Sequence, residues 1–207
     1  DARIPQLFAA NGAVANPRFC DAAIGDFTGD GFVDIFYTDY DTPETSGQIC
    51  IDLNADGDTL DAGECQQSPA ETAANDFNNK FLVNLGASNP GYFVDTTTTR
   101  MTATQLASAF GNSALAADLN ADGKLDIVRV NTLTAGQDVA TIYSKPDGLG
   151  TSFNGPVQAV AGAPYFIDKG DLNGDGKLDL VVVDDGQDKV LINTGNNASG
   201  YANFTSY

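Results

Sequence analysis

Three short stretches of the chain carry oxygen-bearing side chains at the same spacing. In the third stretch these occupy positions 1, 3, 5 and 9 of a loop, at Asp171, Asn173, Asp175 and Asp179. Gly176 holds position 6, where a tight turn needs the positive φ that glycine adopts without strain. A calcium ion takes six to eight oxygen ligands, several of them from carboxylates. The spacing therefore favours a calcium loop, in which the backbone carbonyl of Lys177 at position 7 is a further ligand.

The same spacing occurs twice earlier in the chain. The oxygen-bearing side chains there are Asp26, Thr28, Asp30 and Asp34 in the first copy and Asp118, Asn120, Asp122 and Asp126 in the second. Each copy leads into an apolar run of strand length: Ile35–Tyr37, Ile127–Val130 or Leu178–Val183. A single copy is equally compatible with a solvated Asp-Gly turn. Three copies with one spacing and one strand context favour metal binding over that reading.

Aligning the three loops divides the chain into units, and each unit is expected to contain four strands, the first two joined by the Asp-rich loop. In the first unit the expected strands are Phe19–Gly25, Val33–Thr38, Lys80–Asn84 and Tyr92–Asp95. In the second they are Ser113–Ala117, Leu125–Asn131, Val139–Ser144 and Val157–Val160. In the third they are Tyr165–Gly170, Leu178–Asp184, Lys189–Asn193 and Ala202–Ser206.

Four-stranded units that repeat in this way predict an all-β fold, namely a β-propeller-like array of about three antiparallel blades. The blades cover about residues 18–98, 111–161 and 164–207 of a single propeller segment, and the longer first blade contains an insertion at about 41–75. Residues 1–17 are expected to supply one strand, at 6–10, to a preceding blade. Small residues in the first strands, such as Ala23 and Ala116, suit strands that crowd around a central axis.

These units resemble the FG-GAP/VCBS repeats of integrin-α-type propellers, whose loops read Asp-x-(Asp/Asn)-x-Asp-Gly-x-x-Asp. The resemblance covers about 150 residues and implies that positions 1, 3, 5 and 9 and the carbonyl of position 7 bind calcium. Thr28 departs from the pattern with a neutral hydroxyl, so the first site is expected to be the weakest. The implied ligands are Asp26, Thr28, Asp30, Phe32 and Asp34; Asp118, Asn120, Asp122, Lys124 and Asp126; and Asp171, Asn173, Asp175, Lys177 and Asp179.

The insertion carries a different acidic loop. It is similar to an EF-hand loop with one residue inserted after Gly57, because the hydrophobic anchor and the last ligands fall one position late. The expected ligands of this fourth calcium ion are Asp52, Asn54, Asp56, Asp58, Asp61 and Glu64. The alternative is a metal-free acidic loop stapled by a disulfide. Cys50 and Cys65 bracket the loop and are expected to pair, with Cys20 left free, whereas the other reading is three reduced thiols.

Composition narrows the classes of function. The chain has no histidine, which excludes Ser-His-Asp and Cys-His catalysis and histidine-ligated metals. A net charge of −18 argues against nucleic acid and anionic membranes as partners, and no apolar stretch is long enough for membrane insertion. The start at Asp1 suggests a processed or trimmed product. Calcium loops of moderate affinity fill most readily outside the cell, so an extracellular, secreted or cell-surface location is expected.

The expected function is a calcium-stabilised binding or assembly module, for example in cell adhesion, and not an enzyme. One alternative is a carbohydrate-binding lectin with a tyrosine platform drawn from Tyr37, Tyr40, Tyr92, Tyr143 and Tyr165. A second alternative is the scaffold part of a polysaccharide-degrading enzyme, and a carboxylate site among Asp39, Asp41 and Glu44 stays open.

The expected partners are other propeller blades, supplied by a longer protein or by self-assembly, and a protein or glycan ligand. Three blades are too few for a closed propeller, so the two end sheets are expected to expose apolar faces. These faces are expected to carry Phe36, Phe81, Val128, Val181 and Leu191.

Overall fold

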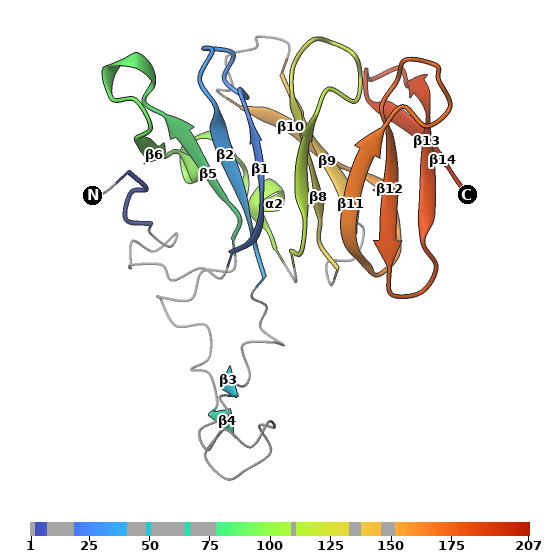
Figure 1. Cartoon of the computed structure of the whole chain (residues 1–207), viewed down its shortest axis with the longest axis horizontal. Helices are drawn as coiled ribbons and strands as arrows, with labels where there is room; N and C mark the ends of the chain where they lie inside the picture. The colour runs from blue at the N-terminus through green and yellow to red at the C-terminus, as the bar shows by residue number, and fades with distance from the viewer. Residues whose placement is uncertain are drawn as a thin grey trace.

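The computed structural model is all-β over the residues that it describes (Figure 1). These are residues 3–7, 19–40, 78–108, 111–132, 138–145 and 152–207, together with the backbone of 49–50 and 65–66. They form three four-stranded antiparallel sheets in which neighbouring strands follow one another along the chain, except that a two-stranded insertion separates the second and third strands of the first sheet. This part of the fold prediction is therefore confirmed.

The observed strands match the predicted ones closely. The first sheet contains β1 (Phe19–Gly25), β2 (Asp34–Asp39), β5 (Lys80–Asn84) and β6 (Phe93–Asp95). The second contains β7 (Ala114–Ala117), β8 (Asp126–Val130), β9 (Val139–Ser144) and β10 (Phe153–Val160). The third contains β11 (Pro164–Gly170), β12 (Asp179–Asp184), β13 (Lys189–Asn196) and β14 (Ala202–Ser206). A two-stranded ribbon, β3 (Ile49–Cys50) and β4 (Cys65–Gln66), lies within the predicted insertion.

The sheets stack side by side through their first strands. β7 of the second sheet lies against both β1 and β11. Gly25 permits this approach, because a Cβ atom there would lie 2.5 Å from Leu125 Cδ1 and 3.3 Å from Ala116 Cβ. Asp21 joins the first two sheets directly, since its Oδ2 accepts hydrogen bonds from Ser113 Oγ at 3.0 Å and Ala114 N at 3.1 Å.

Two apolar clusters fill the spaces between the sheets. The first joins β2 and β5 to β7–β10 and includes Phe36, Phe81 and Ile127. The second joins the second sheet to the third and includes Val128 and Leu191. All five side chains are fully buried. The second sheet is thus covered on both faces, which explains why β8 and β9 are buried along their whole length rather than at alternate residues.

This burial corrects one prediction. Four residues expected on exposed end faces, Phe36, Phe81, Val128 and Leu191, have no exposed surface. Their side chains point toward the neighbouring sheet, so they belong to the interior of the stack. Of the residues predicted there, only Val181 lies on the side of the third sheet away from the second, and it is half-buried.

The link from the first sheet to the second contains two four-residue helices, α1 (Thr97–Arg100) and α2 (Ala103–Leu106), that were not predicted. Thr102 and Gln105 form a reciprocal capping box at the start of α2. The buried Gln105 side chain also donates to Phe153 O at 3.0 Å, which ties the helix to β10.

The N-terminal segment lies against the first sheet. Leu7 is buried against Leu82, and Arg3 O accepts a hydrogen bond from Phe93 N of β6 at 2.9 Å. Gln6 and Leu7, the described part of the strand predicted at 6–10, are not in a strand. Residues 8–10 lie outside the described residues.

The predicted disulfide between Cys50 and Cys65 can be tested by peptide mapping without reduction. β3 and β4 pair antiparallel with Cys50 opposite Cys65. Opposite residues of such a pair have Cα atoms about 4.5–5.5 Å apart, within the range of about 4.4–6.8 Å that disulfides span. Cys20 is exposed and free. We expect one peptide that links Cys50 to Cys65 and an alkylated Cys20, and a bridge that contains Cys20 would contradict the prediction.

Candidate metal centre

The three Asp-rich loops lie at the same edge of the molecule, each between the first and second strands of a sheet (Figure 1). In the third loop, Asp171 Oδ1 accepts from Gly174 N at 2.7 Å and Asp175 N at 3.1 Å, and its Oδ2 accepts from Gly176 N at 2.9 Å. Asp26 makes the same three bonds, and Asp118 makes the last two. The position-1 carboxylate therefore shapes each loop by gathering backbone N–H groups.

Position 5 continues this pattern. The carboxylates of Asp30, Asp122 and Asp175 each accept a hydrogen bond of 2.9 Å from the backbone N–H two residues later. The three loops thus share one backbone conformation as well as one sequence spacing.

Two positions in each loop have a left-handed backbone. At position 6 the φ values are +86° at Gly31, +85° at Gly123 and +83° at Gly176, as the sequence predicts. A Cβ atom would meet nothing within 4 Å there, so glycine is needed for its conformation and not for space. Position 4 is also left-handed, which was not predicted. Among the described residues, Ala121 at this position is the one non-glycine residue with a positive φ, at +55°.

The position-9 aspartates are fully buried, unlike those at positions 1 and 5. Asp179 Oδ2 accepts from Leu172 N at 2.9 Å, and its Oδ1 accepts from Asn193 N of β13 at 2.8 Å. Asp126 makes the equivalent bonds to Leu119 N at 3.2 Å and Ser144 N at 3.0 Å. This carboxylate therefore clamps the loop to the third strand of its own sheet.

Asp34 completes the set. Its Oδ2 accepts from Phe27 N and Thr28 N, both at 3.1 Å, and its Oδ1 accepts from Asn84 N of β5 at 3.0 Å. The same clamp is thus built once in every unit.

The third-strand residue of each clamp returns a hydrogen bond to the loop. Asn84 Nδ2 donates to Val33 O at 3.1 Å, Asn193 Nδ2 to Leu178 O at 3.2 Å, and Ser144 Oγ to Leu125 O. These three residues were not identified from the sequence. The sequence contains a pattern that marks two of them. Asn84 and Asn193 each precede a glycine by two residues, and the side-chain oxygen of each accepts a hydrogen bond from the N–H of that glycine.

Burial dominates the electrostatics of the clamp. It raises the pKa of Asp126 to about 7, although the N–H groups of Ser144 and Leu119 lower it. It raises the pKa of Asp34 in the same way. At the exposed rim, a hydrogen bond from Lys177 lowers the pKa of Asp175, and the Lys177 Nζ to Asp175 Oδ2 distance is 2.8 Å. A bound divalent cation would favour the charged form of every carboxylate near it.

The donor set of each loop fits a hard divalent cation. Positions 1, 3 and 5 offer carboxylate, amide or hydroxyl oxygens, and position 7 offers a carbonyl. In the first loop Thr28 Oγ1 is buried. The hydroxyl lies close enough to Asp34 to lower the pKa of that carboxyl, against the larger effect of burial.

Among the described residues, no group of three or more carboxyl or thiol side chains is arranged so that it could hold a metal ion. The clamp gives the physical reason, because the position-9 carboxylates turn into the sheet toward backbone N–H groups. Their predicted role as metal ligands stays a prediction. The ligands predicted in the insertion, from Asp52 to Glu64, lie outside the described residues.

The residues of the alternative functions do not gather at one place, although Tyr40 and Tyr165 are neighbours: burial raises the pKa of Tyr40, and the nearby Cys20 and Tyr165 raise it further. Tyr143 is buried and stacks on Tyr201, Tyr37 stacks on Phe19, and Tyr92 is 38% exposed. Asp39 is buried in β2, whereas Asp41 and Glu44 lie outside the described residues.

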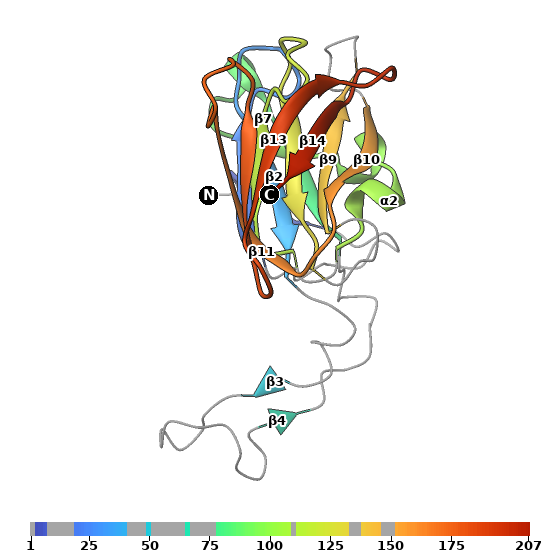
Figure 2. The same ribbon diagram turned by 90° about the vertical axis from the view of Figure 1, so that its right-hand side faces the viewer.

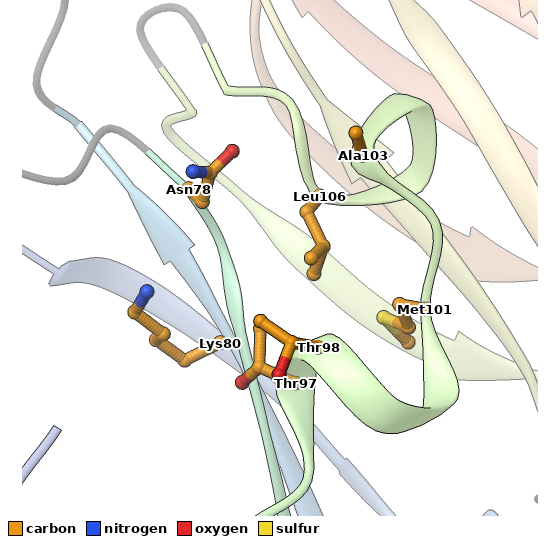
Figure 3. A pocket seen from close by; sticks show the side chains of 7 residues that line it. All are labelled: Asn78, Lys80, Thr97, Thr98, Met101, Ala103 and Leu106. Atoms are coloured by element: carbon orange, nitrogen blue, oxygen red, sulfur yellow. The ribbon is translucent and has the colours of Figure 1, made fainter. Parts of the chain in front are cut away.

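A small cavity of about 190 Å³ lies between α1, α2 and the start of β5 (Figure 3). The predicted metal ligands do not line it. Its walls are mostly apolar and are formed by Asn78, Lys80, Thr97, Thr98, Met101, Ala103 and Leu106.

The chain matches no protein-family model and no curated protein. Among the described residues, the helices are too short and too polar to cross a membrane. The metal assignment therefore rests on the repeat within this chain.

The contribution of the position-9 clamp to stability can be measured apart from metal binding when the protein is unfolded in the presence of a chelator. Asp179→Asn replaces one carboxylate oxygen with an NH2 group, which cannot accept a hydrogen bond, so the N–H of either Leu172 or Asn193 loses its partner. We expect this variant to lower the free energy of unfolding by about 1–3 kcal/mol in urea titrations.

Asp175→Asn is the matched control, because it makes the same change at an exposed position of the same loop. It should leave the unfolding midpoint in chelator nearly unchanged. Equal effects of the two variants would show that the position-9 aspartate has no special structural role.

Proposed function

We propose that this chain is a calcium-stabilised extracellular binding and assembly module built from β-propeller blades. The observation that carries the proposal is that three loops of one spacing fold in one way at one edge of the molecule. One solvated turn needs no ligand to explain it. The same set of hard oxygens built three times is best explained by three cations of one kind.

The role proposed for calcium is structural. Positions 1 and 5 bring two carboxylates together in every loop, and the chain carries a net charge of −18. Like charges held this close disfavour the compact state, and a divalent cation between them relieves the repulsion. Binding to the folded chain alone then stabilises it by mass action. Because the clamp ties each loop to the third strand, this stabilisation acts on the whole sheet and not on the loop alone.

The propeller arrangement is supported by how the sheets meet. Their first strands, β1, β7 and β11, lie next to one another, and the chain order within each sheet runs away from them. Small residues at this meeting point, such as Gly25 and Ala116, allow a close approach. Blades of a propeller crowd in this way at their inner strands.

A binding role is preferred to catalysis because the acidic side chains have other tasks. In the three loops, the buried position-9 aspartates accept backbone N–H groups, and the aspartates at positions 1 and 5 are proposed calcium ligands. A carboxylate held ionised by a cation is a poor proton donor near neutral pH.

Calcium titration of the chelator-stripped protein tests the proposal. We expect at least three ions to bind at millimolar calcium, as counted by native mass spectrometry. We also expect the melting temperature to fall in chelator and recover with calcium. Magnesium should replace calcium poorly, because it demands stricter octahedral geometry and keeps its waters.

Two variants sharpen this test. Asp175→Ala should remove one ion and leave the others, whereas Thr28→Asp should tighten the first site by adding a carboxylate. A protein that binds no calcium at millimolar concentration, with an unchanged melting temperature, would rule the proposal out.

A further inference from the structure

Equivalent residues of the three units differ in exposure at one end of the molecule. At loop position 2, Phe27 is 3% exposed and Leu119 is 2% exposed, because the next sheet covers each of them. Leu172 occupies the same position in the third loop and is 51% exposed. The side chain is apolar in all three units, and among the described residues only the third has no sheet packed against it.

The second strands show the same difference. Two and four residues after the position-9 aspartate, Val128 and Val130 of β8 are buried against the third sheet. The equivalent Val181 and Val183 of β12 are half-buried and 46% exposed. Phe166, opposite Val183 on β11, is 56% exposed. Figure 2 looks at this end of the molecule, with β13 and β14 in front.

We call the side of the third sheet that carries Phe166, Val181 and Val183 the open face. It also carries a hydrogen-bonding group of the kind that joins the first two sheets. Asp21 Oδ1 accepts from Ala22 N at 2.8 Å, which leaves Oδ2 to accept from Ser113 and Ala114 of the next sheet. Asp168 Oδ1 accepts from Lys169 N at the same distance. Asp168 is exposed on the side that Val181 shares. Its Oδ2 is therefore oriented by the same local bond on the face that has no sheet in front of it.

The first sheet presents the complementary face. One residue after the position-9 aspartate, Ile127 and Leu180 are fully buried against the preceding sheet. The equivalent Ile35 is only half-buried, and Ile24 opposite it is 61% exposed. The N-terminal segment covers part of this face, because Leu7 and Leu82 form a cluster against which Ile35 also packs, whereas Ile24 stays exposed.

We propose that a second copy of this chain docks the uncovered part of its first sheet, around Ile24, on the open face of the third sheet around Phe166, Val181 and Val183. This contact repeats the two sheet-to-sheet interfaces that already exist within the chain. The inference rests on the stacking part of the proposed function and is independent of calcium binding.

Each copy has one face of each kind, so two copies can join head to tail at both ends. A head-to-tail contact gives a closed ring when its rotation closes and a filament when it does not. Two copies bring six sheets together, which lies within the about four to eight blades of closed propellers. The proposed assembly is therefore a closed dimer with two equivalent interfaces.

Sedimentation velocity and light scattering on the whole chain in calcium test this proposal. Salt of about 0.3 M screens the repulsion between copies that each carry a charge of −18. We expect a particle of twice the 21.5 kDa chain mass. Val183→Asp and Ile24→Asp should each weaken dimerisation at least tenfold, because each places a charge in both interfaces.

Val94→Asp is the matched control, since Val94 is a valine 40% exposed on β6 and away from both end faces. It should leave the dimer intact. All three variants should keep the far-UV spectrum and calcium stoichiometry of the parent, so a failure of docking is distinguishable from a failure of calcium binding. A monomer at every concentration, a polymer without a dimer plateau, or an Ile24→Asp variant that dimerises normally would overturn the proposal.

Discussion

The buried aspartate at loop position 9 is the interaction on which the structure depends. Each of its oxygens accepts a backbone N–H, one from the loop and one from the third strand. A carboxylate with no exposure to water is tolerable only when such bonds replace its hydration. Because the aspartate is also the first residue of β2, β8 or β12, one side chain fixes the loop, the second strand and the third strand together.

The strands could be predicted because turns and apolar runs alternate regularly. The loops mark where the first strand ends and the second begins, and their repetition transfers the boundaries of one unit to the next. β10 shows the limit of this reasoning. It begins at Phe153 rather than Val157, because a register shift follows Asn154 and the Phe153 side chain fills the space between the first two sheets. An irregular strand has no period that the sequence can reveal.

The features of the site that the sequence did not predict also have a physical explanation. The three expected sets of ligands were selected by their chemistry, whereas Ser144 and Asn193 contribute backbone N–H groups, which every residue except proline possesses. α1 and α2 escaped notice because a four-residue helix is too short to show helical periodicity. The depth of burial was misjudged at Phe36 and Leu191 because composition alone does not tell which face of a strand meets the next sheet.

The loops and the sheet interfaces are parts of one system. Asn120, at position 3 of the second loop, donates from Nδ2 to Gly200 O at 3.1 Å, and its backbone carbonyl oxygen accepts from Asn196 Nδ2 at 2.7 Å. Asn193 Nδ2 bridges the same two sheets by donating to Leu119 O at 2.9 Å. A cation that orders the second loop would therefore also order the contact between the second and third sheets. The third loop has no following sheet within the described residues, and residues 171–176 are all exposed. The third unit thus holds its loop by the clamp and by hydrogen bonds within the loop. A docked copy would supply the covering sheet that the first two loops already receive from the next unit.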